Sequence, residues 1–554
     1  GENIPGITDN NLPQDLQLWR TYDLCHSLPL QRDAGVCGDA GVCGRTPDTQ
    51  KEDDTFSQAV GGELTPAESG RMSESTPCEP RCWGAIIRQV ACALVVSSTM
   101  LHVGLVMGWP AVLPELQADN TTAFNLTDND VKWLVSSTGL AGMAGNLCAG
   151  TLMETLGPRR LLTVLLLPAT VFWLLQAFTP SLAMIYVGRL GGSMLASIIT
   201  TITCPLLAEL LEPDYRGLLC SLPELMVSAG LLLGYLQAHQ LSWQVATAVS
   251  AVPLLPLCLL TLAVPESPFW LVRRGRIQEA ERSLRKIRGS TRYRQKDELP
   301  QIRRSIQEHP QTTVKDQVKQ LWAAHHLKPV GLLVAVFTLR ELGGQYAVFS
   351  YTIYLFQYAG LHLDAFTCTI LVGVARLVAT GVSAIFLDRI GRRPLLITTS
   401  VGCAVSAAIG GVFLLVDIQG SSWILLAAVL VFVLSYGLGV GPIPWVLLGE
   451  LLPTPVRSIG ASITTFFFAL MLFLVGFVFP ELARLAGTGG SLLVFAAFNS
   501  IMAAVVWIFL PETGGCSLHQ LQGMFSITPP VRPLLDVTTI TDSQEETPSL
   551  DQPS

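Results

Sequence analysis

Apolar residues along this chain gather in long stretches that are separated by short polar segments. A helix needs about 20 mainly apolar residues to cross the hydrocarbon core of a bilayer. Stretches of this length recur through most of the sequence, so the pattern predicts membrane-spanning helices. Twelve are expected, at residues 86–109, 130–153, 159–179, 182–210, 217–238, 243–264, 330–357, 365–387, 393–416, 422–450, 458–482 and 488–510.

The twelve predicted spans fall into two groups of six, divided by a long polar segment. The expected fold is an all-α polytopic membrane protein with a cytoplasmic helical loop between its halves. The chain then divides into a disordered acidic cytoplasmic tail, an N-terminal six-helix half, a basic linker, a C-terminal six-helix half and a second cytoplasmic tail, at residues 1–85, 86–264, 265–329, 330–510 and 511–554.

The composition favours lipid rather than water around most of the chain. Half of the 554 residues are apolar and 14% are charged, whereas soluble domains are about a quarter charged. The net charge of −7 argues against a nucleic acid as partner. The sequence shows no nucleophile–base constellation, no zinc-ligand spacing and no phosphate-binding glycine loop. We therefore expect no enzyme activity, no cofactor and no metal.

Basic residues are concentrated in the segment between the two halves. Residues 265–329 hold 15 of the 35 Lys and Arg, and basic residues that flank membrane spans stay on the cytoplasmic side. The Arg159-Arg160 and Arg392-Arg393 turns lie an even number of predicted spans away, so they are predicted on the same side. Both chain ends are then cytoplasmic, and we expect a multi-pass protein of the plasma membrane.

Two glycosylation acceptor sequences give a second indication of orientation. Asn120-Thr-Thr and Asn125-Leu-Thr both lie between the first and second predicted spans, on the side opposite the basic linker. Glycans are added on that side only, so Asn120 and Asn125 are predicted to be glycosylated.

The two halves repeat three charged motifs at a spacing of about 240 residues. Their residues are Glu154, Arg159, Arg160, Glu209, Arg216 and Glu266 in the first half, and Asp388, Arg392, Arg393, Glu450, Arg457 and Glu512 in the second. Carboxylates and guanidinium groups on neighbouring turns form charge-assisted hydrogen bonds. An ordinary charged membrane edge explains any single motif, but the repeat favours a cytoplasmic gate that opens as the halves rock apart.

Several longer strings lie within residues 86–522: Gly157-Pro-Arg-Arg160, Gly188-Arg189, Pro205-Leu-Leu-Ala-Glu209, Pro265-Glu-Ser-Pro268, Asp388-Arg-Ile-Gly-Arg-Arg393, Gly441-Pro-Ile-Pro-Trp445 and Pro511-Glu-Thr-Gly514. Together they resemble the sugar porter family of the major facilitator superfamily, which includes facilitative glucose transporters and insect trehalose transporters. The resemblance implies two six-helix halves in the lipid bilayer and alternating access to a central cavity. It also implies a small hydroxylated solute, namely a hexose, a disaccharide or a polyol.

The cavity positions diverge from the family pattern, in which side-chain amides bind sugar hydroxyls. The family's two adjacent Gln and its Asn on the seventh span correspond to Arg340, Glu341 and Tyr346 here. A Gln on the fifth span corresponds to Glu224, and an Asn-Trp pair on the eleventh to Phe468 and Ala469, whereas Trp445 keeps its family identity. The substrate-binding residues implied by the resemblance are therefore Glu224, Arg340, Glu341, Tyr346, Trp445 and Phe468.

Charged residues within the predicted spans allow two interpretations. A charge in the bilayer costs from about 2.5 kcal/mol upward, so Arg340, Arg376, Glu224 and Glu341 either contact a charged or strongly hydroxylated solute or form structural salt bridges. On a continuous helix, Arg340 and Glu341 lie about 100° apart and Arg340 and Tyr346 about 120°. We expect Glu341 to face the cavity with Tyr346 at its flank, and Arg340 to find a partner on a neighbouring span.

The sequence therefore predicts an alternating-access transporter of a sugar or sugar-like solute. The first span lacks a carboxylate. Proton-driven members of the family that the chain resembles carry an Asp there, so facilitated diffusion is favoured. The alternatives are a proton-coupled carrier of a charged or polyol solute and a non-transporting receptor or scaffold with the same fold.

Overall fold

The computed structural model describes residues 83–119, 124–179, 181–212, 217–289, 292–308, 319–322, 324–358, 363–416, 423–452 and 456–513. All of them belong to one compact unit, residues 79–554. The predicted tails at 1–85 and 511–554 lie outside the described residues, apart from three positions of each.

Every regular element in these ranges is a helix. The first half contains α2 (Trp83–Ser98), α3 (Leu101–Gly108), η2 (Trp109–Val112), α4 (Leu113–Ala118), α5 (Asp128–Leu156), α6 (Pro158–Ala177), α7 (Leu182–Leu210), α9 (Leu222–Gln240), α10 (Trp243–Val249) and α11 (Leu254–Ala263). The linker contains α12 (Pro268–Arg273), α13 (Ile277–Arg288) and α14 (Arg292–Glu308). The second half contains α16 (Ala324–Leu342), α17 (Gln345–Ser350), α18 (Thr352–Tyr358), α19 (Ala365–Ile390), α20 (Arg392–Val416), α21 (Trp423–Ser435), η3 (Tyr436–Val440), α22 (Ile443–Leu451) and α23 (Arg457–Phe509).

The described helices coincide with the twelve predicted spans. Ten segments are long and apolar enough to cross a membrane. One of them, Ile459–Phe509, turns at Gly487 (φ 73°) and covers the eleventh and twelfth predicted spans. α5 occupies the second predicted span but is less apolar, because it carries polar residues such as Ser136 and Asn146, both of which are buried within the protein. The described helices therefore lie at the positions that the apolar lengths predicted, although the seventh predicted span is broken.

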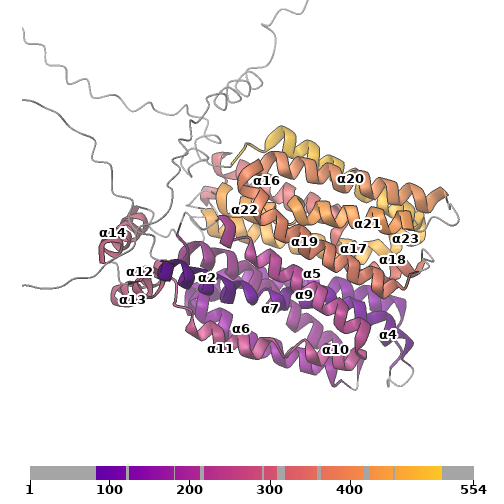
Figure 1. Ribbon diagram of the computed structural model, residues 1–554, viewed down its shortest axis with the longest axis horizontal. Coiled ribbons are helices and arrows are strands. Elements are labelled where there is room, and N and C mark those ends of the chain that lie inside the picture. The colour runs from indigo at the N-terminus through magenta and orange to yellow at the C-terminus, as the bar shows by residue number, and fades with distance from the viewer. Residues whose placement is uncertain are drawn as a thin grey trace, which may run out of the picture. The chain divides into compact units, whose positions relative to one another are not determined.

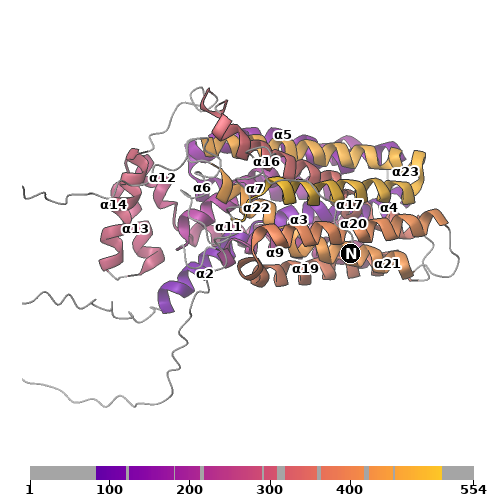
Figure 2. The same cartoon turned by 90° about the horizontal axis from the view of Figure 1, so that it is seen from above.

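Two helix pairs make most of the contact between the halves: α5 packs against α23, and α9 packs against α19. Figure 1 shows the first half, indigo to magenta, beside the second half, orange to yellow, with α12–α14 at one end. Figure 2 shows the same arrangement from another side. We call the end that carries α12–α14 the linker end.

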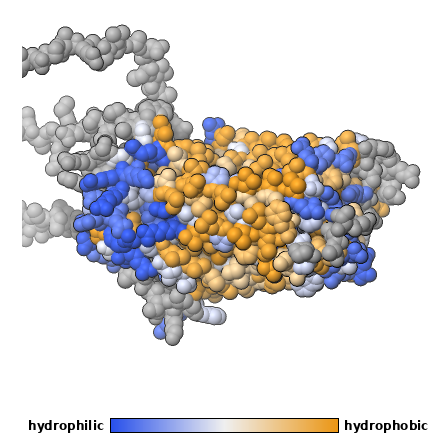
Figure 3. Space-filling model, turned by 90° about the horizontal axis from the view of Figure 1, so that it is seen from below, coloured by the Kyte–Doolittle hydropathy of each residue, from blue (hydrophilic) through white to orange (hydrophobic). Residues whose placement is uncertain are grey.

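The surface has the distribution expected of a membrane protein. Figure 3 shows a broad hydrophobic zone between hydrophilic residues at the two ends. Large apolar side chains such as Leu259 (70% exposed) and Val171 (61% exposed) lie on the surface of the protein. Lipid is the solvent in which this exposure is favourable, because it removes the cost of contact with water.

The seventh predicted span is broken, which corrects the assumption of a continuous helix over 330–357. α16 ends at Leu342, and Gly344 adopts a left-handed conformation with φ 86°. A Cβ atom at Gly344 would lie 2.2 Å from the ring of Phe495, so both the backbone and the packing require glycine there. The angle of about 120° between Arg340 and Tyr346 does not apply, because it assumed regular helix between them.

The linker helices have a small core of their own. It consists of Trp270, Leu271, Val272, Ala280, Leu284 and Ile302. α13 buries Ala280, Leu284 and Ile287 on one face and exposes Arg282 and Arg285 on the other. This amphipathic pattern holds the basic linker as folded helices beside the first half.

Candidate functional site

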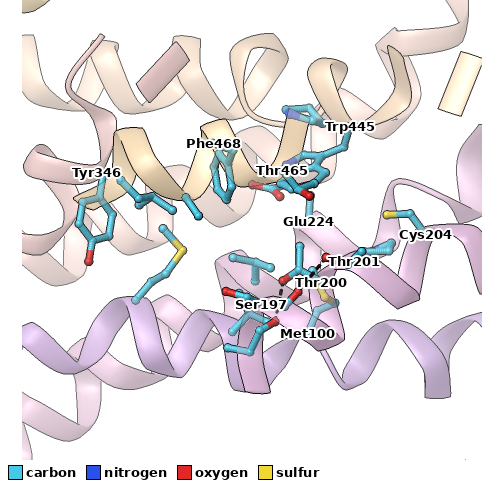
Figure 4. Close-up of a pocket in the computed structure, with 18 of the residues that line it drawn as sticks. Met100, Ser197, Thr200, Thr201, Cys204, Glu224, Tyr346, Trp445, Thr465 and Phe468 are labelled. Carbon is cyan, nitrogen blue, oxygen red and sulfur yellow. Dashed lines mark hydrogen bonds between the residues drawn. The ribbon is translucent and has the colours of Figure 1, made fainter. Parts of the chain in front are cut away.

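A cavity lies between the two halves, and residues from both line it. The first half contributes from α3, α5, α7 and α9, and the second from α16, α17, α19, η3, α22 and α23. All six residues that the sequence assigned to substrate binding line this cavity: Glu224, Arg340, Glu341, Tyr346, Trp445 and Phe468. Figure 4 shows Glu224, Tyr346, Trp445 and Phe468 around a common space with Ser197 and Thr200.

Arg340 and Glu341 form a buried ion pair within one helix. The Arg340 Nη1 atom lies 2.9 Å from Glu341 Oε1, and Gln345 Nε2 donates to the same oxygen at 3.1 Å. Arg340 also donates to the Tyr436 hydroxyl at 2.5 Å and to the Val440 carbonyl at 3.1 Å, both in η3. Arg340 thus has the partner on a neighbouring span that we expected, Tyr436, and it also pairs with the adjacent carboxylate of Glu341.

Aromatic rings enclose the Arg340 guanidinium. Its carbon lies 5.5 Å from the ring centroids of Tyr436 and Phe468, and 5.9 Å from that of Trp445. The Trp445 and Phe468 rings also pack against each other, with centroids 5.4 Å apart. Cation–π attraction therefore adds to the ion pair, and the same rings give the cavity an apolar wall on which the face of a sugar ring can stack.

A second ion pair crosses between the halves. Arg376 on α19 donates from Nη2 to Glu224 Oε1 on α9 at 3.1 Å. The Arg376 guanidinium also lies 4.4 Å from the ring centroid of Phe349. Arg376 was recognised in the sequence as a charge in a span, but it was not assigned to the site. Its signal was the charge itself, since an arginine within a bilayer needs a partner.

Tyr346 lines the cavity but uses its hydroxyl elsewhere. The hydroxyl donates to the Val135 carbonyl on α5 at 2.8 Å. Tyr351 donates to the Gly476 carbonyl at 3.0 Å, within the second half. Tyr346 therefore connects the second half to the first.

A polar face of α7, which was not identified from the sequence, also lines the cavity. Its cavity-lining residues are Ser193, Ser197, Thr200, Thr201 and Cys204. The spacing of four, three, one and three residues places them along one side of a helix, so a polar stripe in an apolar span was the available signal. Thr201 donates to Asn146 Oδ1 at 3.1 Å, and Asn146 Nδ2 donates to the Thr465 carbonyl in the other half at 2.8 Å.

At the linker end, two of the first-half motif carboxylates, Glu266 and Glu209, accept hydrogen bonds from neighbouring segments. Glu266 accepts the backbone N–H groups of Arg159 (2.9 Å) and Arg160 (3.3 Å) at the start of α6. Glu209 accepts from the Ser267 hydroxyl and from Arg273 Nη2, the latter at 3.1 Å. Glu266 is therefore an anion at a helix N-terminus, where the helix dipole stabilises it.

The second half repeats this arrangement. Glu512 accepts the backbone N–H groups of Arg392 (2.9 Å) and Arg393 (3.1 Å) at the start of α20. Glu450 accepts from the Thr513 hydroxyl at 2.7 Å and from Arg392 Nη2 at 3.4 Å. The sequence repeat is thus also a structural repeat.

Other motif residues are only partly described. Arg216 lies outside the described residues, as do the side chains of Asp388 and Arg457. The Glu154 side chain is exposed, and its carbonyl accepts from Trp270 Nε1 at 2.9 Å. Asn125 is exposed before α5, and Asn120 lies outside the described residues. Among the residues that the structure describes, no cluster of three His, Cys, Asp or Glu side chains suits a metal ion.

Comparisons with known proteins agree with this architecture. Residues 91–525 match the family described as "Sugar (and other) transporter". The facilitated trehalose transporter Tret1 of Polypedilum vanderplanki is 30% identical over 446 residues, covering 79% of this chain and 88% of that protein. The one from Aedes aegypti is 32% identical over 440 residues, covering 78% of this chain and 54% of its own length. This chain thus spans about half the length of some relatives.

Solved structures of the xylose transporter XylE share the fold. The complex of this proton:xylose symporter with 6-bromo-6-deoxy-D-glucose gives a TM-score of 0.63 at 23% identity, covering 80% of this chain and 98% of XylE. A partially occluded inward-open conformation of the E. coli protein gives 0.64 at 23% identity, covering 78% and 100%. Because the family match covers residues 91–525 and a named relative is 30% identical over 88% of its length, the chain belongs to the sugar (and other) transporter family.

Proposed function

We propose that this protein carries a sugar or sugar-like hydroxylated solute across a membrane by alternating access. The observation that carries the proposal is a cavity to which both halves contribute side chains. Two repeated halves around a central site are the arrangement that alternating access requires. Membership of a sugar transporter family gives the class of solute, and the named trehalose-transporter relatives make a disaccharide a primary candidate.

The side chains around the cavity suit a neutral solute rich in hydroxyl groups. Ser197, Thr200 and Thr201 on α7 and Gln345 on α17 offer polar groups that both donate and accept hydrogen bonds. Trp445 and Phe468 offer apolar ring faces opposite the α7 residues (Figure 4). The charges of Arg340, Glu341, Arg376 and Glu224 are matched as two ion pairs, so the cavity carries no excess charge from them.

Facilitated diffusion is the mode of transport that we propose. Between Ile86 and Trp109 there is no Asp or Glu, so the first span offers no carboxylate that a proton can neutralise. The repeated motif residues at the linker end serve as the gate: Glu209 contacts Arg273 of the linker helix α12, and Glu450 contacts Arg392 at the start of α20. Breaking or remaking such charge-assisted bonds shifts the balance between the two open states.

We further propose a plasma-membrane location with the linker end and both termini in the cytoplasm. The support is the concentration of 15 of the 35 Lys and Arg in residues 265–329. Asn125, which is exposed at the opposite end of α5, is then outside and glycosylated together with Asn120. An acceptor sequence introduced near residue 295 is expected to remain unmodified, and a glycan there contradicts this orientation.

The decisive experiment is uptake by the full-length protein reconstituted in vesicles. The panel contains labelled glucose, trehalose, a polyol and an organic acid, each with and without a pH gradient. We expect saturable uptake of a neutral sugar, counterflow when the vesicles are preloaded with the same sugar, and no accumulation driven by pH. Binding without counterflow supports the receptor alternative, and accumulation with the pH gradient supports proton coupling.

A further inference from the structure

A second pocket lies at the linker end, on the outside of the first half. Its lining residues come from the end of α5, the start of α6 and the linker: Thr155, Leu156, Arg160, Val164, Trp270, Arg274 and Arg276. We propose that this pocket, called here the basic-edge pocket, binds the phosphate of an anionic phospholipid. The proposal does not depend on which solute the central cavity carries.

The basic-edge pocket has a surplus of positive charge. Three of its lining residues are arginines and none is acidic. Arg276 is neutralised by Glu279, with contacts of 2.7 and 2.6 Å. Arg274 donates to the Glu154 carbonyl at 2.6 Å, which leaves its charge without a carboxylate partner. Within the described part of the chain, the Arg160 side chain has no hydrogen bond or ion pair.

The nearby carboxylates do not cancel this surplus. The two oxygens of Glu266 are occupied by the backbone N–H groups of Arg159 and Arg160. The Glu154 side chain is exposed and does not line the pocket. Guanidinium groups bind phosphate oxygens through charge-assisted hydrogen bonds, so Arg160 and Arg274 form a suitable cradle for one phosphate.

Apolar side chains continue from the pocket along the outside of the bundle. Leu156 is 45% exposed and Val164 is 55% exposed, and both line the pocket. Leu167 and Val171 follow on the same exposed face of α6. A free phosphate makes no use of such a surface, whereas a phospholipid lays its acyl chains along it. The apolar surface next to the pocket therefore favours a phospholipid over a soluble anion as the ligand.

Trp270 indicates that the pocket lies at the depth of lipid headgroups. Its indole Nε1 donates to the Glu154 carbonyl at 2.9 Å, and the Arg274 guanidinium lies 5.8 Å from its ring centroid. Tryptophan is enriched at the membrane–water boundary because it combines an apolar ring with one donor. Basic pockets at the cytoplasmic surface of membrane helices bind anionic headgroups, which fits the orientation proposed above.

The test is lipid binding to the purified full-length protein, measured by native mass spectrometry. The protein is titrated with dioleoyl-phosphatidylglycerol, with dioleoyl-phosphatidylcholine and with inorganic phosphate. We expect phosphatidylglycerol to bind more tightly than phosphatidylcholine, and Arg274→Gln to weaken this binding about fivefold. Arg274→Lys, which keeps the charge, is expected to retain most of it.

Arg282→Gln is the matched control, because it removes one exposed charge from the same linker outside the pocket. It is expected to leave lipid affinity within twofold of the native value. Equal losses in Arg274→Gln and Arg282→Gln contradict a defined site, because they indicate attraction to the basic linker as a whole. Equal binding of the two lipids, or competition by phosphate at the same concentration as lipid, also overturns the proposal.

Discussion

Two buried ion pairs line the same cavity but connect different parts of the molecule. Arg340 and Glu341 are consecutive residues at the end of α16, so their contact of 2.9 Å lies within one helix. Arg376 and Glu224 are 3.1 Å apart and belong to different halves. Movement of one half against the other leaves the first pair unchanged, but it must alter the second wherever α9 and α19 separate.

The two pairs also differ in their other contacts. Arg340 has hydrogen bonds to Tyr436 and Val440 and three aromatic rings around it. For Arg376, the Nε and Nη1 atoms have no hydrogen-bond partner among the described residues. We infer that the Arg340 pair fixes the cavity wall, whereas the Arg376 pair takes part in the motion between states.

The largest effect is expected from Arg340→Gln. The substitution leaves the Glu341 carboxylate buried without its cation and removes two further hydrogen bonds. Breaking a buried pair in this way lowers the free energy of unfolding by about 3–5 kcal/mol. Thermal unfolding of the purified protein measures this, with Arg282→Gln as a surface control. A melting temperature equal to that of the control contradicts a structural role for the pair.

Glu341→Gln is expected to be milder. The amide oxygen still accepts from Arg340 and Gln345, so only the charge is lost, at about 1.5–3 kcal/mol of stability. Because an amide also donates to hydroxyl groups, we expect the remaining folded protein to prefer neutral sugars more strongly. Surface abundance and competition by sugar acids separate the two effects. If Glu341→Gln has native surface abundance and an unchanged preference among solutes, Glu341 does not contribute to the substrate site.

Glu224→Gln is expected to cost less stability, about 1 kcal/mol. The Glu224 side chain is 12% exposed, against 3% for Glu341, and the amide that replaces its carboxylate still accepts a hydrogen bond from Arg376. The same substitution should change transport kinetics more than stability, because this pair joins the halves. Sugar uptake per folded molecule, compared between Glu224→Gln and Glu341→Gln, checks the contrast. A greater loss of stability in Glu224→Gln than in Glu341→Gln contradicts the expected contrast.

The smallest effect is expected on the polar face of α7. Thr201→Val removes a hydroxyl that donates to Asn146 but keeps the side-chain shape. The same hydroxyl lines the cavity and can bind the solute; a hydrogen bond to the solute contributes about 0.5–1.5 kcal/mol, so KM is expected to rise less than about fifteenfold. The dependence of uptake rate on sugar concentration gives this value. Ser406→Ala is a matched control, because Ser406 lies on α20 outside the cavity.

The spans and the site were predictable from the sequence to different degrees. Apolar length alone placed the helices, because a bilayer fixes the length of any helix that crosses it. The six cavity residues came from resemblance, position by position, and they do line one cavity. Salt bridges among Arg340, Arg376, Glu224 and Glu341 were one alternative from the sequence, but it did not say which arginine pairs with which carboxylate, because Arg376 and Glu224 are 152 positions apart and only tertiary packing brings them together.

Local geometry limited the prediction on the seventh span. A regular helix places Arg340 and Glu341 on different sides, yet a long arginine side chain can turn back to its neighbour. The break at Gly344 was signalled by Gly343-Gly344 in the sequence, because glycine favours the left-handed conformation seen there. Reading that pair as a helix end would have placed Tyr346 on a separate helix from Arg340.

The most direct test of the account is a double-mutant cycle on the pair that crosses the halves. Arg376→Gln, Glu224→Gln and their combination are reconstituted, and initial sugar uptake is measured per folded molecule. We predict that Arg376→Gln strands Glu224 and loses uptake, whereas the double variant regains it, with a coupling energy of about 0.5–3 kcal/mol. Uptake in the double variant as low as the product of the two single losses contradicts the claim that this pair couples the halves during transport.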